Sequence, residues 1–219
     1  MVTGLFQEDE TKLFKRVVEP DMTFVDVGAY VGYFTLLASS LIGPAGKVYA
    51  FEPDTDAFEF LRANLQANAC TNVVAVNKGV WETSASANLV RDPYGPESFV
   101  SLDEATGRSN PIGLISLDSF FESAGWPRVD LVKMNIEGSE LWALRGMRSV
   151  CKRNPAIQLA MEFNPTAMIR SGVSRHDLAT ILAELGFRRA RVVERNLTSL
   201  PSGELLPADS GVYNIFLTK

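Results

Sequence analysis

The sequence between residues 24 and 53 constrains the fold of this chain more than any other segment. It reads FVDVGAYVGYFTLLASSLIGPAGKVYAFEP and predicts a strand, a glycine turn, a helix and a second strand that ends in an acid. Residues 24–27 form a short apolar run rich in β-branched residues, as buried strands do. Gly28 and Gly32 then allow the backbone to turn tightly and the helix to approach the sheet. This order predicts a βαβ unit whose turn amides face a ligand at the strand ends.

Charged residues at the two strand ends indicate what kind of ligand this unit binds. Glu52 ends the second strand about twenty residues after the turn, where a carboxylate can bind ribose hydroxyls. The G-x-G-x-x-G pattern of dinucleotide sites is absent, because Tyr30 and Tyr33 are not glycines. Asp26 would repel a phosphate, but it suits a ligand that carries an ammonium and a sulfonium group. That charge pattern belongs to S-adenosylmethionine.

Length and composition predict one domain that does not bind nucleic acid. The chain has 219 residues, of which 46% are hydrophobic, so it can bury one sizeable core. We expect a single domain over residues 1–219, with a helical flank at 1–21 and an irregular or hairpin insertion at 81–116. The net charge of −5 provides no basic surface for phosphates, so a polynucleotide partner is not expected.

The sequence predicts neither membrane insertion nor export. Residues 1–10 are polar and acidic, and the longest apolar stretch, around residues 34–42, is too short to cross a bilayer. Cys70 and Cys151 stand alone, without the spacing of a metal or redox site, which a reducing compartment permits. We therefore expect a cytoplasmic protein in which both thiols are inert packing residues.

The chain alternates between helical and strand patterns, which is typical of a parallel sheet with helices on both faces. Helices are expected at 5–18, 54–68, 117–124, 139–147 and 174–185, and a further helix follows the glycine turn and is stopped by residues 43–46. Strands are expected at 24–27, 47–51, 72–76, 129–134, 156–163, 187–193 and 212–217. The last two strands flank a Pro/Gly/Ser loop and predict an antiparallel hairpin. Prolines and glycines between 81 and 116 predict hairpins and irregular loop.

Three motifs in this order resemble the FkbM-type class I methyltransferases. The family pattern is approximately D-V-G-A-N-x-G-x-(Y/F), then A-F-E-P, then K-I-D-V-E-G-x-E. The chain offers residues 26–34, 50–53 and 133–140, and the last motif, KMNIEGSE, is the most specific. The resemblance covers residues 24–162. It implies an α/β, Rossmann-like class I methyltransferase fold: a mostly parallel seven-stranded sheet with an antiparallel C-terminal hairpin and helices on both faces.

Two residues depart from the family pattern. Tyr30 stands where the family usually has asparagine, a residue that tolerates positive φ better than an aromatic one. Its ring would either stack on a ligand or block the turn, or simply pack. Asn135 stands where the family usually has aspartate, and an amide cannot take a proton at neutral pH.

The resemblance implies S-adenosylmethionine as cofactor and S-adenosylhomocysteine as product. The glycine turn would lie under the methionine part, and Asp26 would contact the amino group directly or through a bridging water. Glu52 would hold the ribose, and the residues after the third strand would meet adenine, a position read from order alone. The implied cofactor-binding residues are Asp26, Gly28, Ala29, Tyr30, Gly32, Glu52, Pro53, Lys78, Gly79 and Asn135, with Asn77 beside them.

The implied reaction is an in-line displacement, in which an acceptor oxygen attacks a methyl group on sulfur. Alignment of the reactants and a positioned base are its main requirements. The catalytic candidates are Asn135, Glu137 and Glu162, with Asn135 orienting an acceptor hydroxyl and one of the carboxylates accepting its proton. The helix dipole also favours carboxylates in the first turn of a helix. This structural explanation and a catalytic role fit Glu137 equally well, whereas the structural explanation fits Glu140 better.

Other polar residues are interpreted as structural. Lys133 lies in a strand covered on both faces and needs a partner, for which Glu162 on the neighbouring strand is the candidate. His176 lies in a sequence with the spacing of a capping box, which predicts a solvated first turn. No Cys/His metal site is expected. A magnesium site from Asn135, Glu162 and Asn164 is conceivable because hard oxygen ligands are present, but this cluster has no specific spacing.

The sequence leaves two functions from different classes open. The first is O-methylation of a small-molecule hydroxyl on a sugar, a lipid-linked compound or a secondary metabolite. In that case residues 81–116 and the N-terminal helix would shape the acceptor pocket. The second is a non-catalytic protein that retains the S-adenosylmethionine-binding fold, to which Tyr30 and Asn135 point. A nicotinamide oxidoreductase is a distant third alternative. The acceptor and the oligomeric state cannot be read from the sequence.

Overall fold

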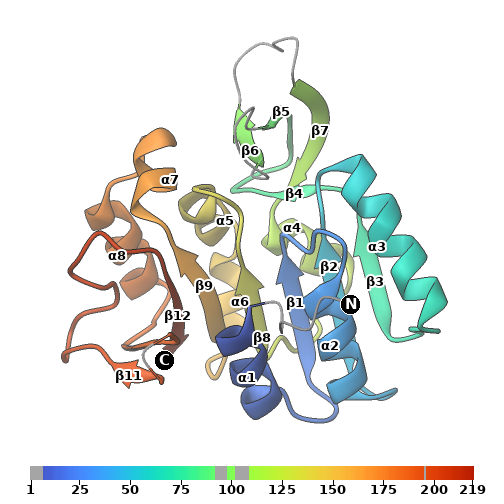
Figure 1. The fold of residues 1–219 in the computed structure, drawn as a ribbon, viewed down its shortest axis with the longest axis horizontal. Helices are drawn as coiled ribbons and strands as arrows, with labels where there is room; N and C mark the ends of the chain where they lie inside the picture. The colour runs from blue at the N-terminus through green and yellow to red at the C-terminus, as the bar shows by residue number, and fades with distance from the viewer. Residues whose placement is uncertain (1–6, 92–97, 102–108, 195) are drawn as a thin grey trace.

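The structure, a computed structural model, describes residues 7–91, 98–101, 109–194 and 196–219 (Figure 1). Its helices are α1 Glu8–Val17, α2 Tyr33–Ile42, α3 Thr55–Ala67, α4 Leu117–Ser123, α5 Glu140–Arg145, α6 Arg148–Arg153, α7 Pro165–Arg170 and α8 Arg175–Glu184. Its strands are β1 Thr23–Val27, β2 Lys47–Phe51, β3 Val73–Val76, β4 Gly79–Val80, β5 Ala85–Arg91, β6 Ser98–Ser101, β7 Ser109–Ile115, β8 Leu131–Met134, β9 Gln158–Phe163, β10 Arg189–Val192, β11 Thr198–Ser199 and β12 Tyr213–Thr218.

The main sheet has eight strands in the order β11-β10-β12-β9-β8-β1-β2-β3. Strands β9, β8, β1, β2 and β3 are parallel, whereas β12 runs antiparallel to both β9 and β10. The mostly parallel sheet with an antiparallel C-terminal hairpin is therefore confirmed. The eighth strand is the two-residue β11, which pairs with β10 inside the segment expected to be a loop. β1 lies inside the sheet between β8 and β2, so its end is surrounded by other strand ends.

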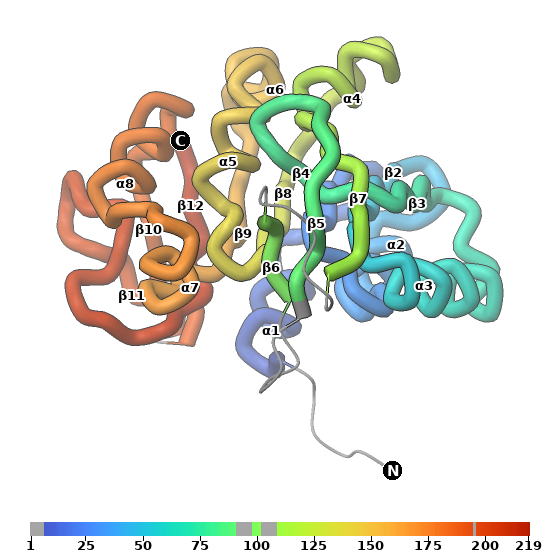
Figure 2. The backbone as a smooth tube through the Cα atoms, turned by 90° about the horizontal axis from the view of Figure 1, so that it is seen from above, coloured from blue at the N-terminus to red at the C-terminus, as the bar shows by residue number. Residues whose placement is uncertain are grey.

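Helices cover both faces of the main sheet, as Figure 2 shows from above. Because side chains alternate along a strand, Phe24 and Asp26 face the side of α1 and α2, and Val25 and Val27 face the opposite side. On the first side, Phe14 of α1 packs edge-on against Phe24, with ring centroids 5.6 Å apart. On the second side, α4, α5, α6 and α8 bury the larger apolar cluster.

A second sheet of four strands, in the order β4-β7-β5-β6, lies beyond the carboxyl ends of the parallel strands, at the top of Figure 1. It occupies most of the segment expected to form hairpins and irregular loop, and the hairpins are confirmed by the antiparallel pairs β5·β6 and β5·β7. Residues 92–97 and 102–108 lie outside the described residues. Trp81 stacks on Trp142 of α5 with ring centroids 5.4 Å apart, which joins the base of this sheet to the main body.

Local capping explains where the helices after β9 begin. Ser174 and Asp177 form the expected capping box at the start of α8. α7 was not predicted, although Asn164 accepts a hydrogen bond from the Ala167 amide and Pro165 occupies the first turn, which is a standard start signal. α6 was also not predicted. Among the described residues, no helix is long and apolar enough to span a bilayer.

Candidate active site

The glycine turn after β1 is held tightly between β2 and the segment after β8. Gly28 and Gly32 have φ values of 77° and 96°, as the predicted tight turn requires. A Cβ atom on Gly28 would lie 2.1 Å from the carbonyl oxygen of Asn135, so only glycine fits there. The amides of Gly28 and Ala29 both donate to the carbonyl of Phe51, at 3.0 Å. The expectation that these turn amides face a ligand is therefore wrong, because they bind the end of β2.

Asp26 and Lys133 form a buried ion pair beneath the turn. Lys133 Nζ lies 3.2 Å from Asp26 Oδ1 and donates to the carbonyl of Gly28 at 2.8 Å. Asp26 Oδ2 accepts a hydrogen bond from Thr35 at 2.7 Å. The structural role expected for Lys133 is confirmed, but its partner is Asp26 and not Glu162. The parallel register places Asp26 directly opposite Lys133, and sequence alone does not show that register.

Asp26 is completely buried, with an exposed fraction of 0%. Its Oδ1 forms the ion pair but makes no hydrogen bond within the described part of the chain. The contact expected between Asp26 and a cofactor, direct or through a bridging water, stays a prediction.

Glu52 links the turn to the loop after β2. Its Oε2 accepts a hydrogen bond from the Tyr30 amide at 2.7 Å, and its Oε1 accepts one from the Asp54 amide at 2.9 Å. The side chain is 6% exposed, and this burial raises the pKa of Glu52 to about 7. Each carboxylate oxygen has two lone pairs, so both oxygens can accept one more hydrogen bond.

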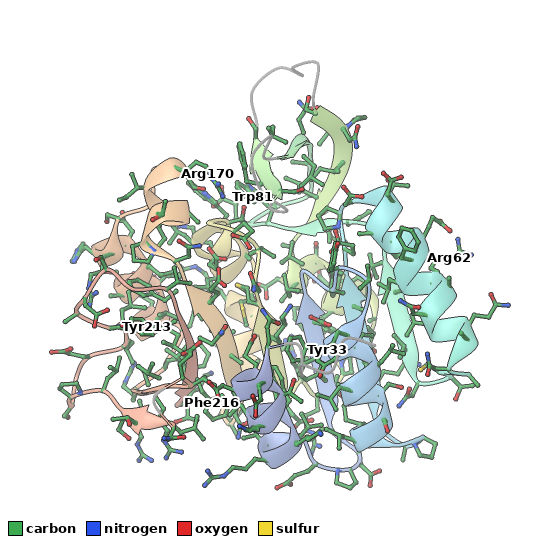
Figure 3. The ribbon with its side chains drawn as sticks, viewed as in Figure 1. Tyr33, Arg62, Trp81, Arg170, Tyr213 and Phe216 are labelled. Carbon is green, nitrogen blue, oxygen red and sulfur yellow. The ribbon has the colours of Figure 1, made fainter. Side chains whose placement is uncertain are left out.

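Tyr30 adopts the left-handed conformation that the family position suggested. Its φ is 51°, which is uncommon for an aromatic residue. The side chain is 61% exposed, so the ring lies at the surface and is not packed into the core. Tyr33, three residues later in α2, is instead in contact with α1 (Figure 3). Its hydroxyl lies 3.0 Å from Thr11 Oγ1.

The residues expected near adenine lie beside Glu52. Asn77 Nδ2 donates to the carbonyls of Glu52 and Pro53, at 2.9 and 3.2 Å. Lys78 is exposed, and Gly79 is buried where β4 begins. The structure thus brings together the ends of β1, β2 and β3, as the sequence order implied.

The catalytic candidates lie at the ends of β8 and β9. Asn135 Nδ2 is 3.5 Å from Glu162 Oε1, a long contact between neighbouring strand ends. Glu137 has a φ of 54°, and its carbonyl accepts a hydrogen bond from Arg170 of α7 at 3.1 Å. Glu140 is 4% exposed and accepts a hydrogen bond from the Ile136 amide, and its burial raises the pKa of Glu140 to about 7.

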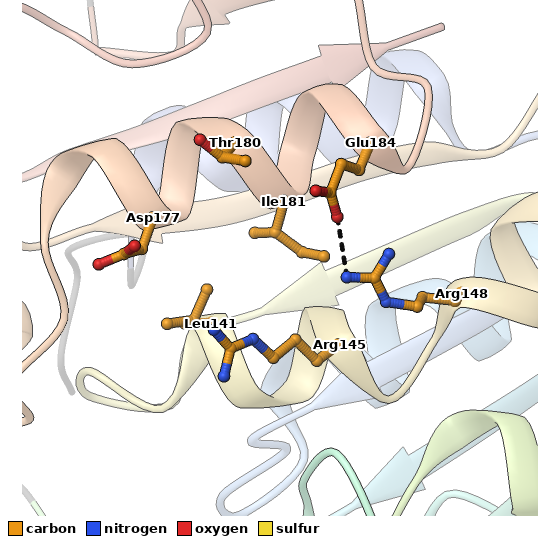
Figure 4. A pocket seen from close by; sticks show the side chains of 7 residues that line it. All are labelled: Leu141, Arg145, Arg148, Asp177, Thr180, Ile181 and Glu184. Carbon is orange, nitrogen blue, oxygen red and sulfur yellow. Dashed lines mark hydrogen bonds and ion pairs between the residues drawn. The ribbon is translucent and has the colours of Figure 1, made fainter.

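The other polar candidates lie at the starts of helices. His176 is exposed in the first turn of α8, and Asn164 uses its side-chain oxygen to cap α7. The described residues contain no group of three His, Cys, Asp or Glu side chains that could hold a metal. A shallow pocket between α5 and α8 contains an ion pair between Arg148 and Glu184 at 2.8 Å and none of the predicted site residues (Figure 4).

One buried carboxylate was missed by the sequence analysis. Glu10 of α1 is 3% exposed and lies in the acidic run Glu8, Asp9, Glu10. Its signal was available, because Glu10 precedes Leu13 and Phe14 by three and four residues and therefore shares their buried helix face.

The sheet order, the glycine turn at the end of β1 and the antiparallel C-terminal strands define the Rossmann-like fold of class I methyltransferases. The model of the methyltransferase FkbM domain matches residues 26–189, and the chain belongs to this family. It is accordingly an S-adenosylmethionine-dependent methyltransferase, in agreement with the resemblance carried by the three motifs.

Similar proteins agree with this class. The hexuronic acid methyltransferase AglP of Haloferax volcanii is 26% identical over 178 residues, which cover 81% of this chain and 68% of that protein. An FkbM methyltransferase structure from Methylobacillus flagellatus has a TM-score of 0.57 at 17% identity, covering 95% of this chain and 50% of that one. An S-adenosylmethionine-dependent O-methyltransferase structure from Thermotoga maritima has a TM-score of 0.56 at 15% identity, covering 100% of this chain and 67% of that one.

Proposed function

We propose that the chain methylates a hydroxyl group of a small-molecule acceptor: a sugar, a lipid-linked compound or a secondary metabolite. The observation that carries this proposal is the contact between the glycine turn and the acceptor-side residues. Gly28 packs so closely on the backbone of Asn135 that no side chain fits between them, and the Asn135 amide lies next to Glu162. A cofactor on the turn would therefore present its methyl group near an amide and a carboxylate.

The residues at the strand ends fit S-adenosylmethionine. Gly28 provides a cradle that a Cβ atom would fill, and Asp26 Oδ1 is a buried acceptor without a hydrogen bond among the described residues. Glu52 retains acceptor capacity for two ribose hydroxyls after its two backbone bonds. We assign the ribose to Glu52, the adenine side to Asn77, Lys78 and Gly79, and the methionine side to the turn from Gly28 to Gly32.

S-adenosylmethionine supplies, when bound, a methyl group on a positively charged sulfur. The chain contributes mainly alignment, which can provide roughly 7–11 kcal/mol of the barrier. Asn135 donates a hydrogen bond from its side-chain amide to the acceptor oxygen and orients it, so that the hydroxyl proton is directed toward Glu162. Glu162 takes the hydroxyl proton while the new carbon–oxygen bond forms and the carbon–sulfur bond breaks. Glu137 is the second candidate for the base.

One of the similar proteins supports a sugar-type acceptor. AglP of Haloferax volcanii is a hexuronic acid methyltransferase. The absence of a basic surface in the composition, with a net charge of −5, also favours a small acceptor over a polynucleotide.

Two measurements test this proposal. Calorimetric titration should show micromolar binding of S-adenosylmethionine and S-adenosylhomocysteine and no binding of NAD. Methyl transfer to a library of hydroxylated acceptors should then be lowered by about 10²–10⁴-fold in kcat in Glu162→Gln, since a positioned base contributes this much. The exposed Glu204→Gln should behave as the wild type. Cofactor binding without transfer to any hydroxyl acceptor would contradict the proposal and favour a non-catalytic binding protein.

A further inference from the structure

Glu140 is a buried carboxylate that binds the backbone of the segment after β8. The residue is 4% exposed, and its Oε1 accepts a hydrogen bond from the Ile136 amide at 3.2 Å. The amides of Gly138 and of Glu140 itself also face this carboxylate and lower its pKa, against the larger effect of burial. The side chain of Glu140 is therefore directed toward the residues that precede it in the chain.

The peptide group that Glu140 binds is the one that touches the glycine turn. The Ile136 amide belongs to the peptide bond between Asn135 and Ile136, and the carbonyl oxygen of this same peptide lies 2.1 Å from the position of a Cβ atom on Gly28. Peptide groups are planar and almost always trans, so their N–H and C=O bonds point in opposite directions. A hydrogen bond that fixes the Ile136 N–H therefore also fixes the Asn135 carbonyl against the turn.

Helix α7 holds the next two residues of this segment. A Cβ atom on Gly138 would lie 2.5 Å from the Ala167 carbonyl oxygen, and the Glu137 carbonyl accepts a hydrogen bond from Arg170 at 3.1 Å. Glu137 has a φ of 54°, a left-handed conformation that persists only where the surrounding contacts impose it. Glu140 and α7 together impose the conformation of this segment.

The peptide between Asn135 and Ile136 lies between the groups assigned to the two reactants. Gly28 belongs to the turn assigned to the cofactor, and the Asn135 side chain is assigned to the acceptor oxygen. We propose that Glu140 is a positioning residue for methyl transfer, which fixes the glycine turn relative to the Asn135 side chain through the Ile136 amide. A displacement of about 1 Å between reacting groups can lower a rate by about 10²-fold. The acceptor half of this inference rests on the proposed function, whereas the cofactor half rests on the enzyme class alone.

Two substitutions separate the reach of Glu140 from its charge. Glu140→Gln keeps an acceptor oxygen at the same distance from the backbone and removes the charge, whereas Glu140→Asp keeps the charge and withdraws both oxygens by one methylene group. In calorimetric titration, we expect Glu140→Gln to bind S-adenosylhomocysteine within about twofold of the wild type and Glu140→Asp to bind it about tenfold more weakly, the factor that one lost hydrogen bond corresponds to. With a methylated acceptor, kcat should fall by about 10–100-fold in Glu140→Asp, with a smaller change in KM, and should be retained in Glu140→Gln.

Asp118→Glu is the matched control, because the Asp118 carboxylate accepts hydrogen bonds from the Ser149 and Val150 amides at 2.9 Å, where α6 begins. It moves a backbone-binding carboxylate by the same one methylene group and should change stability in urea without changing S-adenosylhomocysteine affinity or kcat. Equal affinities in the two Glu140 variants, weaker binding in Glu140→Gln, or an equal loss in Asp118→Glu would overturn the inference. The expected order of affinities without methyl transfer to any hydroxyl acceptor would support the role of Glu140 and contradict the proposed function instead.

Discussion

At the scale of single residues, Gly28 combines two constraints on its side chain. Its φ of 77° favours glycine, and the carbonyl of Asn135 occupies the space of a side chain. Gly43 provides a matched comparison, because its φ is 75° and no atom lies within 4 Å of its Cβ position. The two positions therefore separate backbone strain from steric overlap.

We expect Gly43→Ala to lower the free energy of unfolding by about 1–3 kcal/mol, because its φ of 75° and ψ of −174° lie in a region essentially restricted to glycine. Gly28→Ala adds the clash with Asn135 and should cost at least about 2 kcal/mol more, with loss of S-adenosylhomocysteine binding. Urea unfolding and calorimetric titration measure both effects. Equal destabilisation by the two variants would show that the turn can move away from Asn135.

The sequence predicted residue types better than it predicted residue partners. The turn, the acid at the end of β2 and the burial of Lys133 followed from local pattern. The partner of Lys133 depended on the register between β1 and β8, which no local pattern encodes. Glu10 was hidden in an acidic run, although its spacing from Phe14 placed it on the buried face.

At the scale of elements, the longer amphipathic helices were predicted, as were the short α4 and α5, whereas α6 and α7 were not. α3 and α8 have side-chain caps and clear periodicity, whereas α6 and α7 have six residues each. So short a helix contains too few turns to show a period. β11 has two residues, and its pairing with β10 depends on tertiary structure.

Arg170 of α7 connects the two sheets across the end of the main sheet. Its guanidinium lies 4.5 Å from the centre of the Phe99 ring in β6 and donates to the carbonyl of Glu137. We expect Arg170→Ala to accelerate amide hydrogen exchange in residues 98–101 and to raise KM for the acceptor, with global stability changed by only about 1 kcal/mol.

Arg153→Ala is the control, because Arg153 makes a similar contact with the Trp126 ring at 4.3 Å. It should leave both exchange in β6 and the acceptor KM unchanged. Unaltered exchange in Arg170→Ala would mean that the second sheet is held by its base alone, where Trp81 stacks on Trp142.

At the scale of the whole molecule, three buried glutamates determine how stability depends on pH. Burial raises the pKa values of Glu10, Glu52 and Glu140 from 4.5 to about 7. Between these values the folded chain binds more protons than the unfolded chain. The stabilising contribution of these groups is therefore complete below about pH 4.5 and is lost as the pH rises through about 7.

We expect the free energy of unfolding to fall by several kcal/mol between about pH 4.5 and 7 when no ligand is added. Glu140→Gln keeps the acceptor for the Ile136 amide and removes one titrating group, so it should show a smaller fall. Urea unfolding at a series of pH values provides the measurement. Stability that rises with pH over this window would show that the three carboxyl groups are ionised in the fold.

The segment that forms the second sheet begins and ends at nearly the same place in the structure. Gly79 and Val80 of β4 pair directly with Leu114 and Ile115 of β7, so the two ends of the intervening segment are neighbours. Residues between these ends can be lengthened, shortened or exchanged without breaking a ladder hydrogen bond of the main sheet. This segment can therefore be replaced as one unit, in evolution or by protein engineering, while the cofactor-binding part of the main sheet stays unchanged.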